Sequence, residues 1–235
     1  MTGAGGRGPG RSEALVLMRT RLPGGMILAL LAALYPALLP SATTPREVGL
    51  VAAGGVLSLA LVRGLVAAEL HAGTHLLWIQ KGGRLEHRYL ARLVWVVLLA
   101  MGAHAILLGG SALLDPGAPP LSSGAVATYL LVDLSVVAVG FAVTCAGVPL
   151  ELVAVILLVL GPGMLGSDAQ VAPERWGRWA PWLAAQRFPT LEIHALAKVL
   201  DGGPPPSWAV ARVLAYPAAW IGIGWVALRL RLRRW

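Results

Sequence analysis

Six long apolar stretches dominate the pattern of hydrophobic and polar positions. They lie at residues 25–42, 47–68, 89–113, 124–146, 148–166 and 207–229. A helix needs about 20 residues to cross about 30 Å of hydrocarbon, and each stretch is close to that length. The pattern therefore predicts an all-α, polytopic membrane protein in which residues 25–235 form one domain of six transmembrane helices.

Residues 1–24 precede the first apolar stretch and differ from it in composition. Residues 1–11 are rich in glycine and basic, so we expect a disordered tail. Ser12 is expected to cap a short interfacial helix over residues 13–21. Its apolar residues are predicted to lie in the membrane interface: Leu15, Val16 and Met18. Its basic residues are predicted to face lipid phosphates: Arg19 and Arg21. The alternative is that this stretch only begins the first transmembrane helix.

The longest polar interruption in the first two-thirds of the chain spans residues 69–92. It holds three of the five histidines and four of the nineteen Lys and Arg residues. The spacing from Glu69 to Gln80 predicts a helix in which Trp78 flanks a face of four residues: Leu70, Gly73, Thr74 and Leu77. Lys81-Gly82-Gly83 supplies a helix stop, and a second helix is expected to restart at Glu86. We expect a short helix at the bilayer surface, held between two transmembrane helices.

The composition agrees with a membrane location. Of the residues, 57% are hydrophobic and 13% are charged, with a mean hydropathy of +0.73. A soluble domain has about 25% charged residues. The net charge of +8 could indicate nucleic acid, but the basic residues lie beside the apolar stretches instead of forming one patch. We therefore predict membrane lipids as partners and no nucleic acid. The single cysteine, Cys145, excludes an internal disulfide and a cysteine-based metal site.

The distribution of charge predicts the orientation. Twelve basic residues and three acidic ones fall in the N-terminal segment, in residues 69–92 and at the C-terminal end. The remaining loops are nearly balanced in charge. The positive-inside rule then places both termini and the 69–92 element in the cytoplasm, which requires an even number of spans.

Residues 167–206 are predicted to form an amphipathic segment on the outer face. Several tryptophans, which prefer the headgroup level, lie in it or just beyond it: Trp176, Trp179, Trp182 and Trp208. Thr190 is expected to cap a short helix over residues 191–200.

Two ionisable residues fall near the middle of predicted spans. His104 lies in the third span and Asp133 in the fourth, and counting from opposite membrane faces brings them to a similar depth. We consider them a possible intramembrane polar pair. The pair could form a functional site for a substrate or a proton. The alternative is a structural hydrogen bond between helices.

The sequence offers no motif for catalysis or for a cofactor. His71 and His75 are four residues apart, as two metal ligands on a helix would be, but no further ligands have the usual spacing, so we predict no metal. No phosphate-binding loop occurs, so the chain cannot hydrolyse a nucleotide by itself. No nucleophile elbow is present either, and we assign no catalytic residue and no cofactor.

One local pattern resembles a known family. It consists of Glu69, Gly73-Thr74, Leu76-Leu77, a break, and Leu90-Ala91-Arg92. With the six spans and the interfacial helix, it is similar to the permease subunits of type-2 ATP-binding-cassette exporters, including haem-exporter-B-like permeases. This chain has Lys81-Gly82-Gly83 where that family often has proline followed by serine or leucine.

The resemblance implies a function and partners. Two permease subunits, the same or different, would form a transport pathway in the bacterial cytoplasmic membrane. A coupling helix in each would contact a separate ATPase subunit, which hydrolyses the ATP. The contact residues implied here are Glu69, Gly73, Thr74, Leu77 and Trp78.

Two other functions remain open from the sequence. The first is a non-transporting scaffold or accessory subunit, in which the same basic loop would bind a soluble partner. The second is an integral-membrane, lipid-modifying enzyme built around His104 and Asp133.

Overall fold

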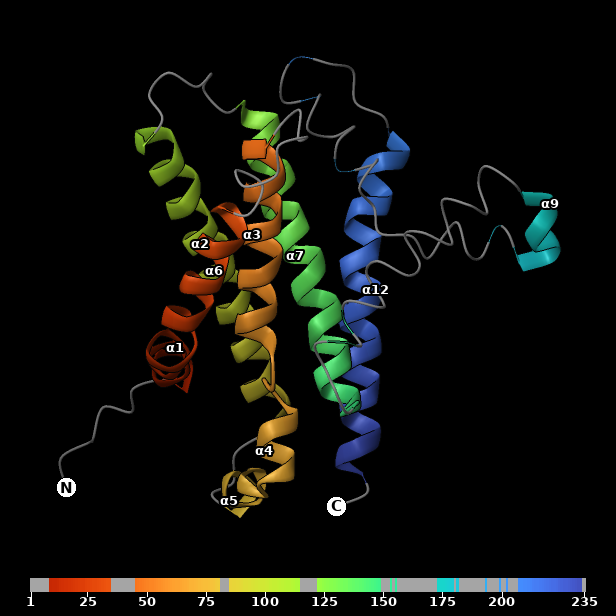
Figure 1. Cartoon of the computed structure of the whole chain (residues 1–235). Coiled ribbons are helices and arrows are strands. Elements are labelled where there is room, and N and C mark those ends of the chain that lie inside the picture. Colours follow the sequence, from red (N-terminus) through yellow and green to blue (C-terminus); the bar gives the residue numbers. More distant parts are fainter. Residues whose placement is uncertain are drawn as a thin grey trace. The chain divides into compact units, whose positions relative to one another are not determined.

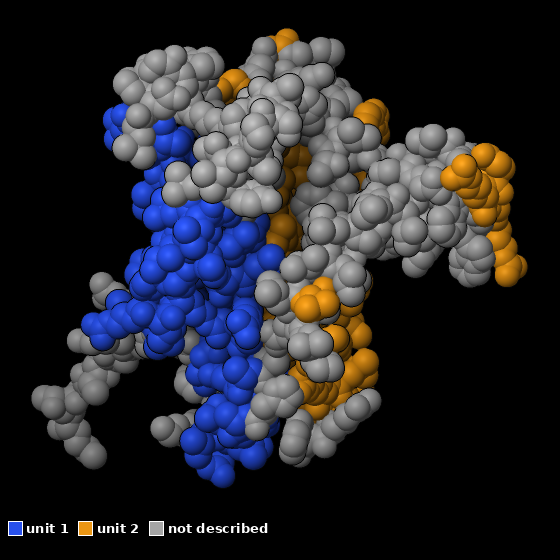
Figure 2. All heavy atoms as spheres, in the orientation of Figure 1, with its two compact units in different colours: residues 1–120 blue, residues 121–235 orange. Residues whose placement is uncertain are grey.

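The computed structural model describes residues 9–34, 45–80, 85–114, 122–148, 173–179 and 207–233, together with single positions at 153, 155, 181, 193, 199 and 202. Every regular element in these ranges is helical. The chain divides into two compact units, Met1–Pro120 and Leu121–Trp235, which are coloured separately in Figure 2. The prediction of an all-α protein is confirmed for the described residues.

Unit 1 contains six of the described helices: α1 Pro9–Thr20, α2 Leu22–Leu34, α3 Pro45–Val62, α4 Ala67–His71, α5 Thr74–Gln80 and α6 Leu85–Leu114. Helix α2 packs against α3, and both α1 and α3 pack against α6. A Cβ atom at Gly25 would lie only 3.1 Å from Leu57 Cδ1, so the missing side chain brings α2 close to α3. Helices α4 and α5 lie beyond the C-terminal end of α3 (Figure 1).

Unit 2 is built on α7, Ser123–Ala146, and α12, Ser207–Leu232, which pack against each other. It also contains the short α9, Pro173–Trp176, and the 3-10 turn η2, Gly177–Trp179. Helix α7 begins where the Ser122 hydroxyl accepts a hydrogen bond from the Ala125 amide at 3.1 Å. It ends at Gly147, whose φ of +68° is left-handed.

Three described helices are long and apolar enough to cross a membrane: Leu85–Leu113, Ser123–Ala146 and Trp208–Leu232. They correspond to the third, fourth and sixth predicted spans and are compatible with an integral membrane protein. Within the first predicted span, residues 22–32 form a shorter apolar helix, and residues 35–42 lie outside the described residues. The fifth predicted span also lies outside them, apart from positions 148, 153 and 155.

Two predicted helix boundaries are wrong. The second apolar helix ends at Val62 instead of residue 68, because Gly64 adopts a φ of +62°. The N-terminal helix begins at Pro9, so Ser12 lies inside it and is not its cap. Proline fits a first helical turn because its missing N–H needs no partner there.

Two further predictions concern the N-terminal interfacial helix and the outer segment at residues 167–206. Leu15, Val16 and Met18 are exposed on α1, and their place in the membrane interface stays a prediction. The prediction that Arg21 faces lipid phosphates is wrong, because its side chain donates to backbone carbonyls of the same unit. The 191–200 helix lies outside the described residues apart from positions 193 and 199, and α9 with η2 is the described continuous part of the outer segment.

Candidate functional site

The polar element between the second and third apolar helices folds as two short helices instead of one. Helix α4 ends at His71, and α5 begins at Thr74. Gly73 separates them with a φ of +69°, a conformation that side chains other than glycine rarely adopt. The prediction of a single helix from Glu69 to Gln80 is therefore wrong. We call residues 67–80 the α4–α5 segment.

The break also overturns the predicted common face. Leu70 is buried, with 3% of its surface exposed, whereas Leu77 is 59% exposed. The two side chains share no face because the chain turns at Gly73. Glycine at this position is explained by its backbone conformation, and no atom lies within 4 Å of where its Cβ would be.

Glu69 anchors the α4–α5 segment to α6. Its Oε1 accepts hydrogen bonds from Arg88 Nη2 at 2.9 Å and from Arg92 Nη2 at 2.7 Å. The carboxylate side chain is 18% exposed, and the two arginine side chains are 15% and 10% exposed. These are charge-assisted hydrogen bonds in a largely shielded place, the setting in which such bonds are strong.

Arg92 also binds the backbone. Its Nη1 donates to the Leu65 carbonyl at 3.1 Å while Nη2 holds Glu69. Its guanidinium lies 6.0 Å from the ring centroid of the fully buried Tyr89, within the range of a cation–π contact. One side chain of α6 thus contacts the chain before α4 and a residue within α4.

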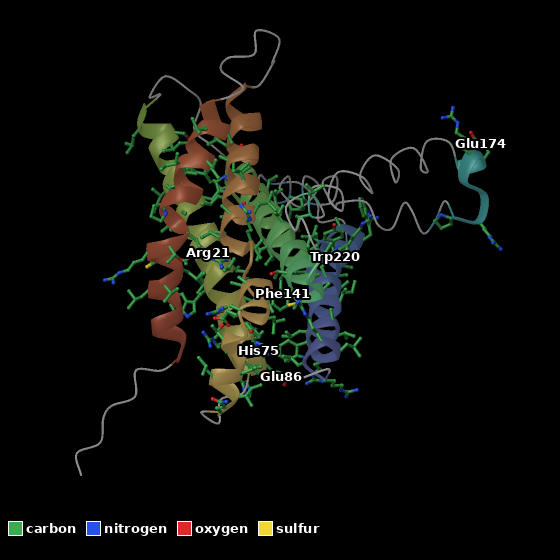
Figure 3. The ribbon with its side chains drawn as sticks, turned by 60° about the horizontal axis from the view of Figure 1, so that its bottom comes forward. Arg21, His75, Glu86, Phe141, Glu174 and Trp220 are labelled. Carbon is green, nitrogen blue, oxygen red and sulfur yellow. The ribbon has the colours of Figure 1, made fainter. Side chains whose placement is uncertain are left out.

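Arg21 binds the end of α3 from the junction of α1 and α2. Its Nη1 donates to the carbonyls of Leu61, at 3.0 Å, and Arg63, and its Nη2 donates to Gly64 at 3.2 Å. The last carbonyls of a helix have no partner within that helix, so a guanidinium is well suited to satisfy them. Figure 3 labels Arg21 in this part of the chain and His75 on α5.

Helix α5 turns one side inward and leaves an apolar side exposed. His75 is fully buried, and its Nδ1 lies 3.4 Å from the Glu69 carbonyl, which also accepts from the Thr74 hydroxyl at 3.4 Å. The exposed side carries three large apolar residues: Leu76, Leu77 and Ile79. An exposed apolar cluster on so short a helix is a candidate surface for contact with a partner protein or with lipid at the membrane interface.

The structure places the predicted contact residues differently. Thr74 and Leu77 are exposed on α5. Gly73 lies in the turn, and Glu69 faces α6. The backbone of Trp78 belongs to α5, but its side chain lies outside the described part of the structure.

The proposed polar pair is divided between the two units. His104 is fully buried in α6 of unit 1, and Asp133 is fully buried in α7 of unit 2. Each is described within its own unit, so the pairing stays a prediction. Among the described residues, no group of three or more His, Cys, Asp or Glu side chains is arranged to hold a metal ion.

The sequence reasoning missed the partners of Glu69. Arg88 and Arg92 entered it as charges that set the orientation, and Arg92 also as the basic residue of the family pattern. A signal was present, because Glu69 and Glu86 are the only acids among residues 69–92, beside four basic residues. Such an imbalance favours a shared carboxylate.

The comparisons with known proteins found nothing similar. No protein-family model, no curated protein and no solved structure matches this chain.

Proposed function

We propose that this chain is the transmembrane permease subunit of an ATP-driven exporter of the ATP-binding-cassette type. In this proposal the α4–α5 segment is the coupling element that binds a separate ATPase subunit in the cytoplasm. The observation that carries the proposal is the two-sided character of this segment. It is fastened by ion pairs to α6 and exposes Leu76, Leu77 and Ile79.

A coupling element must bind its partner and transmit the partner's movement to the membrane helices. The exposed apolar side of α5 suits the contact with a partner, because buried apolar surface drives most protein association. The contacts of Glu69 with Arg88 and Arg92 suit the transmission, because α6 is a membrane-length helix of 30 residues. Coupling of this kind needs an element that joins both sites physically.

Helix directions support a six-span topology. In unit 1, Arg21 lies opposite residues 61–64 and Gly25 lies opposite Leu57, so α2 and α3 are antiparallel. In unit 2, Gly224 lies against Phe141 and Arg231 against Gly147, so α7 and α12 run in the same direction. Two parallel membrane helices need a connection that crosses back between them. The apolar stretch at residues 148–166 would supply that fifth span.

Helix lengths fit the proposed boundaries. Helix α3 has 18 residues and is about 27 Å long at 1.5 Å per residue, close to the hydrocarbon thickness. Helix α6 is about 45 Å long by the same rule and exceeds that thickness. Its first turns, which carry Glu86, Arg88 and Arg92, would therefore project beyond the hydrocarbon beside the α4–α5 segment. In the proposal this is the cytoplasmic side, with both termini on it and with a second permease subunit completing the pathway.

Purification in a mild detergent, followed by mass spectrometry of whatever accompanies the chain, tests the proposal. We expect a partner that contains a phosphate-binding loop, and we expect its ATP hydrolysis to depend on this chain. A partner without such a loop would instead support a non-transporting scaffold. Recovery of the chain alone under several mild detergents would contradict both functions.

A further inference from the structure

The connection between α3 and α4 has an unusual set of hydrogen bonds. Residues 63–66 are not helical, so the carbonyls of residues 63–65 lack the usual helical partners. Arg21 donates to Arg63 and Gly64, and Arg92 donates to Leu65. The next carbonyl, of Val66, accepts from amides of α4 at Glu69 and Leu70. All four carbonyls of this connection are therefore satisfied, three of them by two arginines from other parts of unit 1.

We propose that Arg21, Arg92 and Glu69 act as positioning residues that lock this connection and hold the α4–α5 segment in one orientation relative to α3 and α6. The inference rests on the proposed function for its consequence, because a locked segment transmits force from a docked ATPase. It assigns Glu69 the role of an internal anchor and leaves docking to Leu76, Leu77 and Ile79.

The geometry of Glu69 favours this assignment over direct contact with a partner. Its side chain is 18% exposed, and one carboxylate oxygen accepts from two guanidinium groups. Breaking these bonds to reach a partner would leave two shielded cations without their carboxylate. Leu77, by contrast, has an apolar side chain that is 59% exposed, so a partner can cover it without breaking a polar contact of that side chain.

The short helices need such a lock. Helix α4 has five residues and α5 has seven, and helices of this length are not stable on their own in water. Their orientation must come from contacts with other elements. The contacts of Thr74 and His75 with the Glu69 carbonyl are long, at 3.4 Å each. The ion pairs at 2.7 and 2.9 Å are shorter and involve full charges, so we assign them the larger share.

Arg21 and Arg92 act on the same connection from different helices. Arg21 follows α1 directly, and Arg92 lies two turns into α6. A lysine at either position would keep the charge, but its compact ammonium cannot reproduce the spread of a guanidinium that donates through two nitrogens. Lysine variants therefore test whether the two-nitrogen hydrogen bonding of the guanidinium is needed, because they keep the positive charge.

Hydrogen exchange of the full-length chain in detergent tests the lock without any partner. The variants are Glu69→Gln, Arg92→Lys and Arg21→Lys, with exposed Glu174→Gln on α9 and exposed Arg19→Lys on α1 as matched controls. We expect the amides of residues 67–80 to exchange at least tenfold faster in the first three variants and at the wild-type rate in the controls. Exchange at the wild-type rate in all three would overturn the inference. If Glu69→Gln does not fold, Arg92→Lys still tests the inference, because it keeps the positive charge.

The copurified complex tests the division of roles. The Glu69→Gln variant is expected to recover at least half as much partner as the wild-type chain does. Its stimulation of the partner's ATP hydrolysis is expected to fall at least fivefold. Leu77→Ser is expected to abolish recovery and leave exchange in residues 67–80 of the isolated chain unchanged. Loss of partner with unchanged exchange in Glu69→Gln would make Glu69 a contact residue and overturn the inference. Absence of any ATPase partner would instead refute the proposed function, while the exchange result would still decide the lock.

Discussion

The α3–α4 connection of unit 1 and the α7–α12 pair of unit 2 are held together by different forces. The connection depends on two arginines that bind backbone carbonyls and on a carboxylate that binds two guanidinium groups. The α7–α12 pair depends on close approach, because a Cβ at Gly224 would lie 2.9 Å from the Ala142 backbone. Small residues at helix contacts are typical of packing inside membranes.

The difference shows what each region cannot tolerate. The α3–α4 connection is expected to lose stability when a charge or a hydrogen-bond donor is removed. At the α7–α12 contact, an atom added at Gly224 would have to move the backbone of α7. Four substitutions separate these two kinds of sensitivity, and they are arranged by the size of the expected change in stability.

The largest effect is expected for Gly224→Leu. The new side chain would meet Ala142 and the Phe141 ring, so α7 and α12 must separate, which we expect to lower the free energy of unfolding by about 3 kcal/mol. Thermal unfolding in detergent, followed by size-exclusion chromatography, measures it. Gly222→Leu is the matched control, because no atom lies within 4 Å of its Cβ position. Equal loss in both variants would show that close packing at Gly224 is not the cause.

A smaller effect is expected for Arg21→Gln. The shorter amide cannot reach the carbonyls of Leu61 and Gly64, and leaving such groups without donors is expected to cost about 2 kcal/mol. The same thermal assay applies, with exposed Arg19→Gln as its control. If the two variants unfold alike, the contacts of Arg21 with the end of α3 contribute little.

Gly73→Ala should reduce stability by about 1 kcal/mol, because a left-handed φ of +69° is strained for alanine. Space is not the reason, since nothing lies within 4 Å of the new methyl group. Gly102→Ala on α6 adds the same methyl group in open space within a helix and should be neutral or slightly stabilising. Equal thermal midpoints for the two variants would argue against the turn at Gly73.

Leu77→Ser should change the free energy of unfolding by no more than about 0.5 kcal/mol, because the side chain is 59% exposed. Recovery of a copurified partner should nevertheless be lost. Exposed Gln80→Ala on the same helix controls for general effects on α5. A large fall in the thermal midpoint of Leu77→Ser would indicate that this residue packs within the chain and does not form a docking surface.

Long apolar helices were predictable from the sequence because their signal is local. Helices α6, α7 and α12 begin within four residues of the predicted spans and end within three. Length and composition determine that such segments are helical, whatever they pack against. The cap at Ser122 and the stop at Gly147 are local in the same sense.

Breaks in the shorter helices were not predictable in this way. Gly64 and Gly73 fit a helical pattern as well as a turn, and at the Gly64 turn the bonds that satisfy the carbonyls come from Arg21 and Arg92. Arg21 is 43 residues from Gly64, and Arg92 is 27 residues from Leu65. A hydrophobic pattern carries no information about which basic residue meets which carbonyl. The sequence thus indicated where a candidate site lies but not which residues hold it.

The parallel pairing of α7 and α12 sets an order of assembly. Chains emerge from the ribosome N-terminus first, so the helices of unit 1 are complete before α12 has been made. Helix α7 is complete some 60 residues before α12 begins at Ser207. The α7–α12 contact therefore forms later in synthesis than the contacts within unit 1 can form.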